Sequence, residues 1–314
     1  MKPVAVLLLG LTLLINGPAQ AQSAPNDCSI SSHNFRYCVE PSQRGLAESL
    51  SKVAETYRRK VQADLGRTLA GNTRVVVARG LAKMRAAAPK GTRVPPWAAG
   101  MAFSRRNLIL LRVENRRGAV NDITKVFVHE LAHLALDQAV NFRRLPRWFH
   151  EGFAIHHSGE WSMGRTTALA HGVLSNRLFS LEALTESFPD KPPDVDLAYA
   201  QSIDFVAFLL HRFGRERFRK LIGLLGQDWP FLLGVEEAYD MGIFKLEQEW
   251  HGDLKMRFTW IPFLTGTATL WFLASLVFIA AYLRRRRTKR LGRALLDAQE
   301  DEDVPDPPLT PFSP

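Results

Sequence analysis

The stretch VFVHELAHLAL at residues 126–136 is apolar except for two histidines and one glutamate. The spacing of its apolar residues predicts a buried helix, on which His129 and His133 share one face. Burying three polar side chains costs free energy unless something binds them. The stretch matches the pattern H-E-x-x-H, in which two imidazoles one turn apart suit two corners of a tetrahedral Zn²⁺ site. Glu130 is rotated away from those ligands, where it can act as a general base.

A catalytic zinc site needs a third protein ligand and one open position. Glu151, in the stretch RWFHEGFA at residues 147–154, is the candidate, because the seventeen residues between it and His133 suffice to turn and return on an antiparallel helix. The longer pattern with a third histidine is absent, since Leu136 and Ala139 occupy its glycine and histidine positions. We therefore expect zinc to be held by the two histidines and this glutamate. The alternative is a pair of histidines satisfied inside a core.

These two motifs resemble the gluzincin group of zinc metallopeptidases, in particular the peptidase MA-like domains of bacterial exported proteins. The W-x-x-E-G-x-A pattern is also similar to that of zinc aminopeptidases. PPWAAGMAF at residues 95–103 looks like the family's edge-strand region, where an extended substrate pairs, and AYAQSIDFVAFLLHRFG at 198–214 looks like its later helix. The resemblance covers about residues 95–250.

The resemblance implies hydrolysis of peptide bonds by a zinc-activated water, with Glu130 as the general base. Gluzincins usually add a tyrosine or histidine that donates to the developing oxyanion, and Tyr199 is the candidate here. The alternative for Tyr199 is simple helix packing. No G-x-M-E-N stretch, which in zinc aminopeptidases holds a free substrate amine, occurs in the sequence. An aminopeptidase, a non-catalytic zinc-stabilised scaffold module and hydrolysis of another amide, such as a cell-wall crosslink, remain alternative functions.

The other polar and aromatic residues near the two motifs are predicted to have structural roles rather than to bind metal or substrate. His150 points about 100° away from Glu151 on a helix, and His156 and His157 follow one to two turns later, so none is predicted to bind metal. Asp137 shares a helix face with His133 and could orient its imidazole. Trp148 and Phe149 are predicted to be core residues rather than part of a substrate pocket.

Both ends of the chain indicate export and membrane anchoring. Residues 1–21 have the apolar run and the small-residue cleavage site of a secretory signal peptide. Residues 261–283 carry no charge and are long enough for a transmembrane helix, and RRRRTKR at 284–290 places the C-terminal side in the cytoplasm. We therefore predict a single-pass protein of the bacterial inner membrane, with residues 22–258 forming a periplasmic peptidase domain and 284–314 a basic, then acidic and proline-rich tail.

The cysteines and the charge agree with export. Cys28 and Cys38 are the only cysteines, and we expect them to form a disulfide in an oxidising compartment. The formal net charge of +10 could attract anionic lipid or an anionic substrate, although such a balance is more often solvated surface. No basic stripe with interleaved aromatic residues indicates nucleic-acid binding. The predicted partners are the membrane and a polypeptide substrate, for which envelope and membrane-proximal polypeptides are the candidates. The oligomeric state is not predicted.

The predicted fold is α+β, a zincin-like catalytic domain followed by one transmembrane helix. A helix is expected from Pro41 to about Ala70, ended by Gly71, and a strand in TRVVVARG at 73–80. Residues 98–113 form one bent strand or two strands with a turn at 104–107. The remaining predicted helices are short and follow one another at 81–89, 122–140, 147–157, 164–175, 181–188, 196–213, 215–226 and 244–257, with Gly214 as a C-cap.

Overall fold

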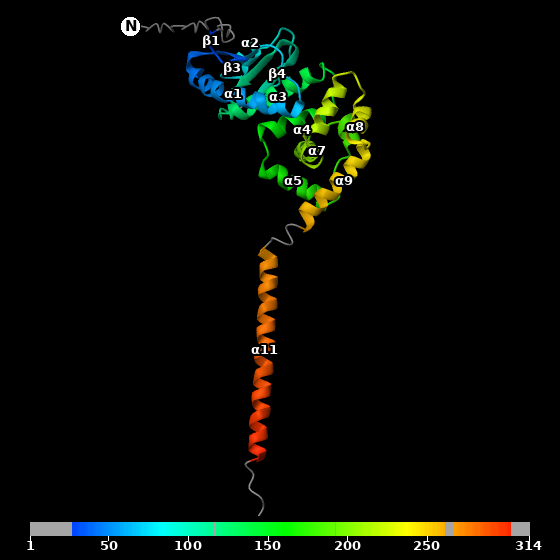
Figure 1. The fold of residues 1–314 in the computed structure, drawn as a ribbon. Helices are drawn as coiled ribbons and strands as arrows, with labels where there is room; N and C mark the ends of the chain where they lie inside the picture. Colours follow the sequence, from blue (N-terminus) through cyan, green and yellow to red (C-terminus); the bar gives the residue numbers. More distant parts are fainter. Residues whose placement is uncertain (1–26, 116, 192, 261–266, 303–314) are drawn as a thin grey trace, which may run out of the picture. The chain divides into compact units, whose positions relative to one another are not determined.

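The computed structural model describes residues 27–115, 117–191, 193–260 and 267–302 (Figure 1). The chain forms two compact units, of which the first comprises Met1–Gly172 with Asn176–Trp250 and the second Val173–Ser175 with His251–Pro314. The predicted signal peptide lies outside the described residues. All residues predicted to act in catalysis or metal binding lie in the first unit.

A five-stranded mixed sheet forms the N-terminal part of the first unit. Its strands are β1 (Asp27–Ser31), β2 (Phe35–Val39), β3 (Thr73–Ala78), β4 (Gly100–Phe103) and β5 (Leu108–Arg112), in the order β1-β2-β3-β5-β4. The three central strands are parallel, whereas β1 and β4 run antiparallel at the two edges. The structure therefore has two strands within residues 98–113, and β4 is an edge strand.

Strands β1 and β2 were not predicted from the sequence. Cys28 in β1 and Cys38 in β2 form the predicted disulfide. The sheet has a core on each face, since neighbouring residues of a strand point to opposite sides. Val76 and Ala78 of β3 belong to a buried cluster with Met84 of α2 (Leu81–Ala87), whereas on the other face Phe35 packs edge-on against Phe127, with ring centroids 5.4 Å apart.

Helices make up most of the remaining described chain before residue 256, and Figure 1 shows the helix after β2 in blue and those after residue 140 in green to orange. They are α1 (Arg44–Leu65), α3 (Ile123–Ala139), α4 (Arg147–Ser158), α5 (Met163–Leu174), α6 (Leu181–Glu186), α7 (Asp194–Leu225), α8 (Phe231–Tyr239) and α9 (Ile243–Lys255). The first of these ends five residues earlier than predicted, because Gly66 adopts φ 64° as its C-cap. The short helix α8 was not predicted, since Gly234 interrupts its apolar pattern. The predicted break at Gly214 is confirmed by φ 81° and ψ 164° inside α7.

Helices α4 and α7 approach each other at backbone contact. A Cβ atom on Gly152 would lie 2.2 Å from the carbonyl oxygen of Ser202 in α7, so only glycine fits at this crossing. Trp148 and Phe149 of α4 are fully buried, and their prediction as core residues is confirmed. Because Gly152 follows Glu151 directly, this tight crossing also fixes the position of the predicted third ligand.

The second unit contains the short helical segment Met256–Trp260 and the long helix α11 (Thr267–Glu302). The predicted membrane span at 261–283 is only partly covered, since 261–266 fall outside the described residues. Among the helices of the described residues, none is long and apolar enough to cross a membrane.

Candidate metal centre

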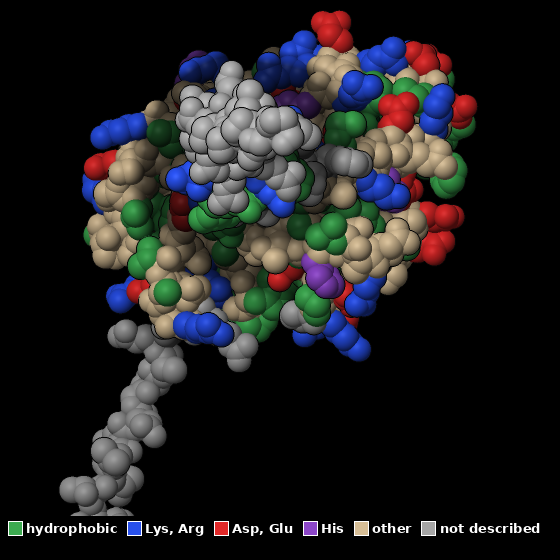
Figure 2. All heavy atoms as spheres, turned by 90° about the horizontal axis from the view of Figure 1, so that it is seen from below, with side chains coloured by type: hydrophobic (Ala, Val, Ile, Leu, Met, Phe, Trp, Pro, Cys, Tyr) green, Lys and Arg blue, Asp and Glu red, His purple; other side chains and the backbone are tan. Residues whose placement is uncertain are grey.

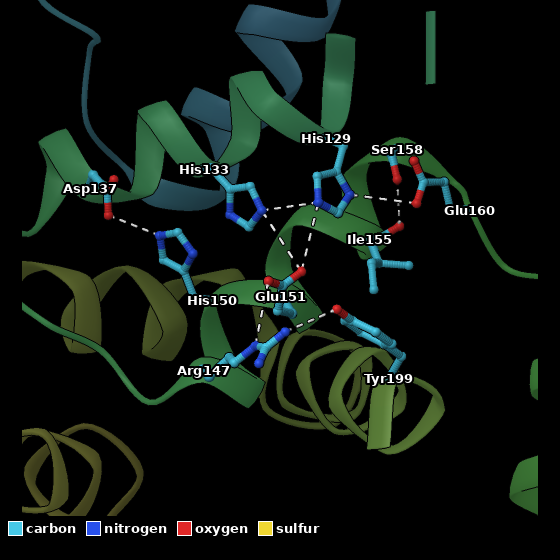
Figure 3. A network of polar contacts seen from close by, with 10 residues as sticks. All are labelled: His129, His133, Asp137, Arg147, His150, Glu151, Ile155, Ser158, Glu160 and Tyr199. Atoms are coloured by element: carbon cyan, nitrogen blue, oxygen red, sulfur yellow. Dashed lines mark hydrogen bonds and ion pairs between the residues drawn. The ribbon is translucent and has the colours of Figure 1, made fainter. Parts of the chain in front are cut away.

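The three side chains predicted as metal ligands lie together, two on α3 and one on α4 (Figure 3). The Nε2 atoms of His129 and His133 are 3.0 Å apart, and Glu151 Oε2 lies 3.8 Å from the first and 3.9 Å from the second. Ligand atoms of a tetrahedral zinc site stand about 3.3 Å apart, given bonds of about 2.0–2.1 Å. The three ligand atoms thus surround a space of the size that zinc requires, and they form the group of described residues that could hold a metal ion.

The electrostatics of these residues also suit a cation. Burial lowers the pKa of His133 well below its usual value, so its imidazole is neutral and has a lone pair to donate. Burial likewise opposes the charged form of His129, but the carboxylates of Glu160, Glu130 and Glu151 outweigh it and raise the pKa of this histidine. A site where nearby carboxylates favour positive charge on an imidazole is a site that a divalent cation can occupy in place of the proton.

Glu130 lies beside this cluster on α3 without joining it. Its side chain is buried, and burial raises the pKa of its carboxyl to about 7, against the opposing effects of His129 and of a hydrogen bond from the Ala102 backbone. Gly100 of β4 packs against it closely: a Cβ atom there would lie 2.6 Å from Glu130 Oε1. The edge strand and the predicted general base are therefore in direct contact.

Tyr199 of α7 faces the same space, as Figure 3 shows. Arg147 Nη2 donates a hydrogen bond to its hydroxyl over 3.3 Å, and Arg147 Nε lies 4.0 Å from Glu151 Oε1. Burial, and then the charge of Glu151, raises the pKa of Tyr199 above its usual value, so the phenol keeps its proton. The predicted proximity of Tyr199 to the site is thus observed, and its oxyanion role stays a prediction.

Asp137 does not orient His133, contrary to the interpretation of their shared helix face. Its Oδ1 lies 2.9 Å from Nε2 of His150 on α4, and its Oδ2 accepts a hydrogen bond from Ser104 Oγ at 2.6 Å. The His150 ring stacks on that of His133, with centroids 4.3 Å apart. His150 therefore packs on the predicted ligand His133 and is itself held by Asp137. A helical periodicity cannot reveal a contact made from a different helix.

Glu160 lies beside the cluster, although no sequence pattern predicted it there. Its Oε2 lies 3.6 Å from Nδ1 of His129, on the side of the ring away from the other ligands. It follows α4, where Gly159 turns the chain with φ 66°. By contrast, His157 is buried with its Nε2 3.5 Å from Asp64 of α1, away from the metal cluster, in agreement with its predicted structural role.

The cluster opens into a cleft of about 680 Å³ that the edge strand borders. Its walls include residues 97–102 and the side chains of His129, Glu130, His133, Glu151, Arg147 and Tyr199. The Arg112 backbone N–H donates to the Ala99 carbonyl over 2.8 Å, and Gly100 and Ala102 pair with Leu111 and Ile109. Because hydrogen-bonded and non-bonded pairs alternate in antiparallel strands, the backbone groups of Gly100 and Ala102 point away from β5 into the cleft.

Comparison with known families agrees with this geometry. The family model of the Peptidase MA superfamily matches residues 81–256, which is more than half of the chain and extends from α2 through α9. No curated protein shows significant similarity to the chain. The matched region includes β4, both helices of the cluster and Tyr199. On this evidence the chain belongs to the Peptidase MA superfamily.

Proposed function

We propose that this protein is a zinc-dependent peptidase that hydrolyses bonds within extended polypeptides. The observation that carries the proposal is the convergence of His129, His133 and Glu151 on one point, with Glu130 alongside and an edge strand facing them. A purely structural zinc site would have four protein ligands and no need of a cleft. Here the described residues supply three candidate ligand atoms, and all three residues line the cleft.

Zinc held by these three residues supplies, when bound, a Lewis acid that lowers the pKa of water and polarises the scissile carbonyl. The chain itself supplies the proton transfer. A general base works best when its pKa is near the working pH, and burial raises the pKa of Glu130 to about 7. Glu130 can accept a proton from water and pass it to the leaving amine.

Tyr199 and Arg147 supply the groups that stabilise negative charge on the substrate. The phenol keeps its proton and lies in the cleft, so it can donate a hydrogen bond to the oxyanion that develops on the scissile carbonyl. Arg147 holds the phenol by the hydrogen bond described above and adds a positive charge. Both residues come from helices that pack through Gly152, which gives the group a rigid frame.

The outward backbone groups of Gly100 and Ala102 support binding of an extended peptide by strand addition. Such binding does not require a free substrate amine. Together with the missing G-x-M-E-N stretch, this favours an endopeptidase over an aminopeptidase. The sequence of both chain ends supports a periplasmic domain anchored in the inner membrane by residues 261–283, so we propose envelope or membrane-proximal polypeptides as substrates.

The test compares the purified full-length chain with its Glu130→Gln variant. We expect about one zinc ion per chain in both, and cleavage of an unfolded protein by the wild type that falls about 10²- to 10⁴-fold in the variant. Equal hydrolysis by both, with zinc bound, would instead favour the scaffold module. Peptides with acetylated and with free N-termini separate the remaining alternative, since an aminopeptidase rejects the acetylated ones.

A further inference from the structure

A second cleft, of about 550 Å³, adjoins the first. The two share four lining residues: Ala102, Asp137, Arg147 and His150. His150, which lines both clefts, stacks directly on the proposed ligand His133. A substrate peptide that lies across the metal centre would therefore continue into the second cleft. It is formed by the end of β4, the turn at Ser104–Arg106 and the loop between α3 and α4.

The second cleft is strongly basic. Five arginines line it: Arg105, Arg106, Arg143, Arg144 and Arg147. Asp137 is the single acidic side chain among the described residues that line it, and its oxygens are occupied by His150 and Ser104. On the face drawn in Figure 2, by comparison, Lys and Arg side chains are interspersed with Asp and Glu. The five arginines therefore make the second cleft more positively charged than the face drawn in Figure 2, where charges of both signs are mixed.

Two of these arginines are available for a ligand. The side chains of Arg106 and Arg144 are exposed, and neither has an ion pair or hydrogen bond with any of the residues that the structure describes. The other three have partners. Arg143 lies 3.3 Å from Asp228, Arg105 stacks over the Phe142 ring, and Arg147 is directed to Glu151 and Tyr199. Unpaired arginines in a concave site are suited to a carboxylate, which the guanidinium can bind through two parallel hydrogen bonds.

We propose that the second cleft is a substrate subsite that binds a carboxylate of the polypeptide, and that Arg106 and Arg144 determine a preference for acidic substrates. This inference rests on the proposed peptidase function. Its position follows from the register of β4. Gly100 lies level with Glu130, and the second cleft begins at Ala102 and continues through Ser104. A paired peptide advances about 3.3 Å per residue in step with the strand, which places the carboxylate about two to four residues from the scissile bond.

The apolar part of the lining indicates which carboxylate fits. Phe103, Phe142 and Leu145 line the same cleft as the arginines. A glutamate side chain can lay its two methylene groups against these residues while its carboxylate reaches a guanidinium, whereas aspartate is shorter and a C-terminal carboxylate is fixed to the backbone. We therefore expect glutamate to be preferred over aspartate and over a free C-terminus.

The experiment uses the zinc-loaded full-length chain in detergent and a set of internally quenched peptides blocked at both ends. Each peptide carries one Glu, Asp or Gln at one of four positions on either side of the scissile bond. A second set of peptides has an unblocked C-terminus, so that the free carboxylate lies at the same distances from the bond. We expect Glu two to four residues from the bond, on one side, to raise kcat/KM about tenfold over Gln, and the effect to shrink at high salt. In Arg106→Gln/Arg144→Gln the Glu-to-Gln ratio should fall close to one.

Matched variants separate local recognition from overall charge. Arg85→Gln/Lys90→Gln removes the same charge from exposed positions outside the cleft and should keep both the activity and the ratio. Arg106→Glu/Arg144→Glu should invert the preference toward peptides with Lys at the same position, an effect that damage to the fold cannot produce. Cleavage with equal rates for Glu and Gln, or a preference that survives in Arg106→Gln/Arg144→Gln, overturns the inference and leaves the peptidase function standing.

A binding measurement distinguishes the remaining outcomes. Fluorescence anisotropy follows a labelled Glu-containing peptide on the Glu130→Gln chain, with and without the two arginine substitutions. If no peptide is cleaved by the wild type but this binding depends on Arg106 and Arg144, the peptidase function fails and the carboxylate site stands. If the peptide is cleaved but binds equally well without the two arginines, the carboxylate site fails.

Discussion

Gly100 of the edge strand leaves no space for a side chain beside Glu130, since a Cβ atom there would stand 2.6 Å from Oε1 and 2.7 Å from Cγ of the glutamate. We predict that Gly100→Ala displaces the general base and lowers kcat at least tenfold, because proton transfer depends on its position to within a fraction of an ångström. Zinc content should stay at the wild-type value. Gly45→Ala, which meets nothing within 4 Å, is the control. Unchanged kcat in Gly100→Ala would show that Glu130 can move without consequence.

The raised pKa of Glu130 predicts a pH-dependent effect on stability in the metal-free protein. The carboxyl has a pKa of about 7 when folded, against an ordinary value of 4.5, so the folded state holds the proton more tightly. Below pH 4.5 the group is protonated in both states and contributes nothing. As the pH rises from 4.5 to 7 the folded state is progressively destabilised, by on the order of 3 kcal/mol at most.

Glu130→Gln removes this penalty. In chelator-treated samples the variant should match the wild type at pH 4 and exceed its free energy of unfolding at pH 8, measured by urea denaturation. A constant difference between pH 4 and pH 8 would mean that the ionisation of Glu130 does not affect folding.

Gly152 is predicted to be essential for the helix crossing that supports the metal site. In Gly152→Ala the new methyl group would meet the Ser202 carbonyl at 2.2 Å, so α4 must move away from α7. We expect a loss of about 1–3 kcal/mol of stability and weaker zinc binding, because Glu151 moves with its neighbour. Thermal unfolding by circular dichroism and zinc titration measure the two effects. Gly252→Ala, in an open helical position, should show neither.

Glu160 is predicted to hold His129 in the orientation that zinc requires. Its carboxylate lies 3.6 Å from Nδ1 of that ring, and removal of such an outer partner typically weakens metal affinity 10- to 100-fold. We therefore expect Glu160→Gln to raise the zinc dissociation constant by at least about tenfold in competition with a chromogenic chelator. Glu236→Gln, an exposed site on α8, provides the comparison. Equal zinc affinities of Glu160→Gln and Glu236→Gln would show that Glu160 contributes only its charge and does not orient His129.

Tyr199→Phe tests the oxyanion role. Loss of one well-placed donor lowers kcat by about 10²- to 10³-fold, with KM and zinc content little changed. The variant keeps the ring that contacts Phe188, with centroids 5.1 Å apart, so packing is preserved. A kcat within a factor of two of wild type would leave Tyr199 as a packing residue.

The residues of the candidate site could be predicted where metal binding requires a fixed spacing of side chains along one helix. His129, Glu130 and His133 lie within five residues, and Glu151 needed only a return helix of suitable length, so the convergence of His129, His133 and Glu151 could be predicted. Glu160 could not, because its approach to His129 depends on the left-handed turn at Gly159 and on no periodic pattern.

The same distinction applies to the fold. The break at Gly214 was predictable from local composition, whereas the edge strand at residues 100–103 was expected from the resemblance of PPWAAGMAF to the family's edge-strand region. Strands β1 and β2 were missed because their pairing is decided by neighbours distant in sequence, as in the contact of β2 with β3. The basic cleft was missed for a related reason: its five arginines come from two separate segments, 105–106 and 143–147, that only the folded chain brings to one place.

The edge strand β4 spans only Gly100–Phe103 before the chain turns away. Of the four outward backbone groups of Gly100 and Ala102, the Ala102 N–H donates to Glu130, so about three remain for a bound peptide, and each such hydrogen bond has modest net strength. A strand this short would bind an extended peptide weakly, and hydrogen bonds to its backbone would not depend on the side chains of the peptide. If the protein cleaves polypeptides as proposed, discrimination among them must come from the two clefts that β4 borders, and the same short strand predicts rapid release of the cut fragments.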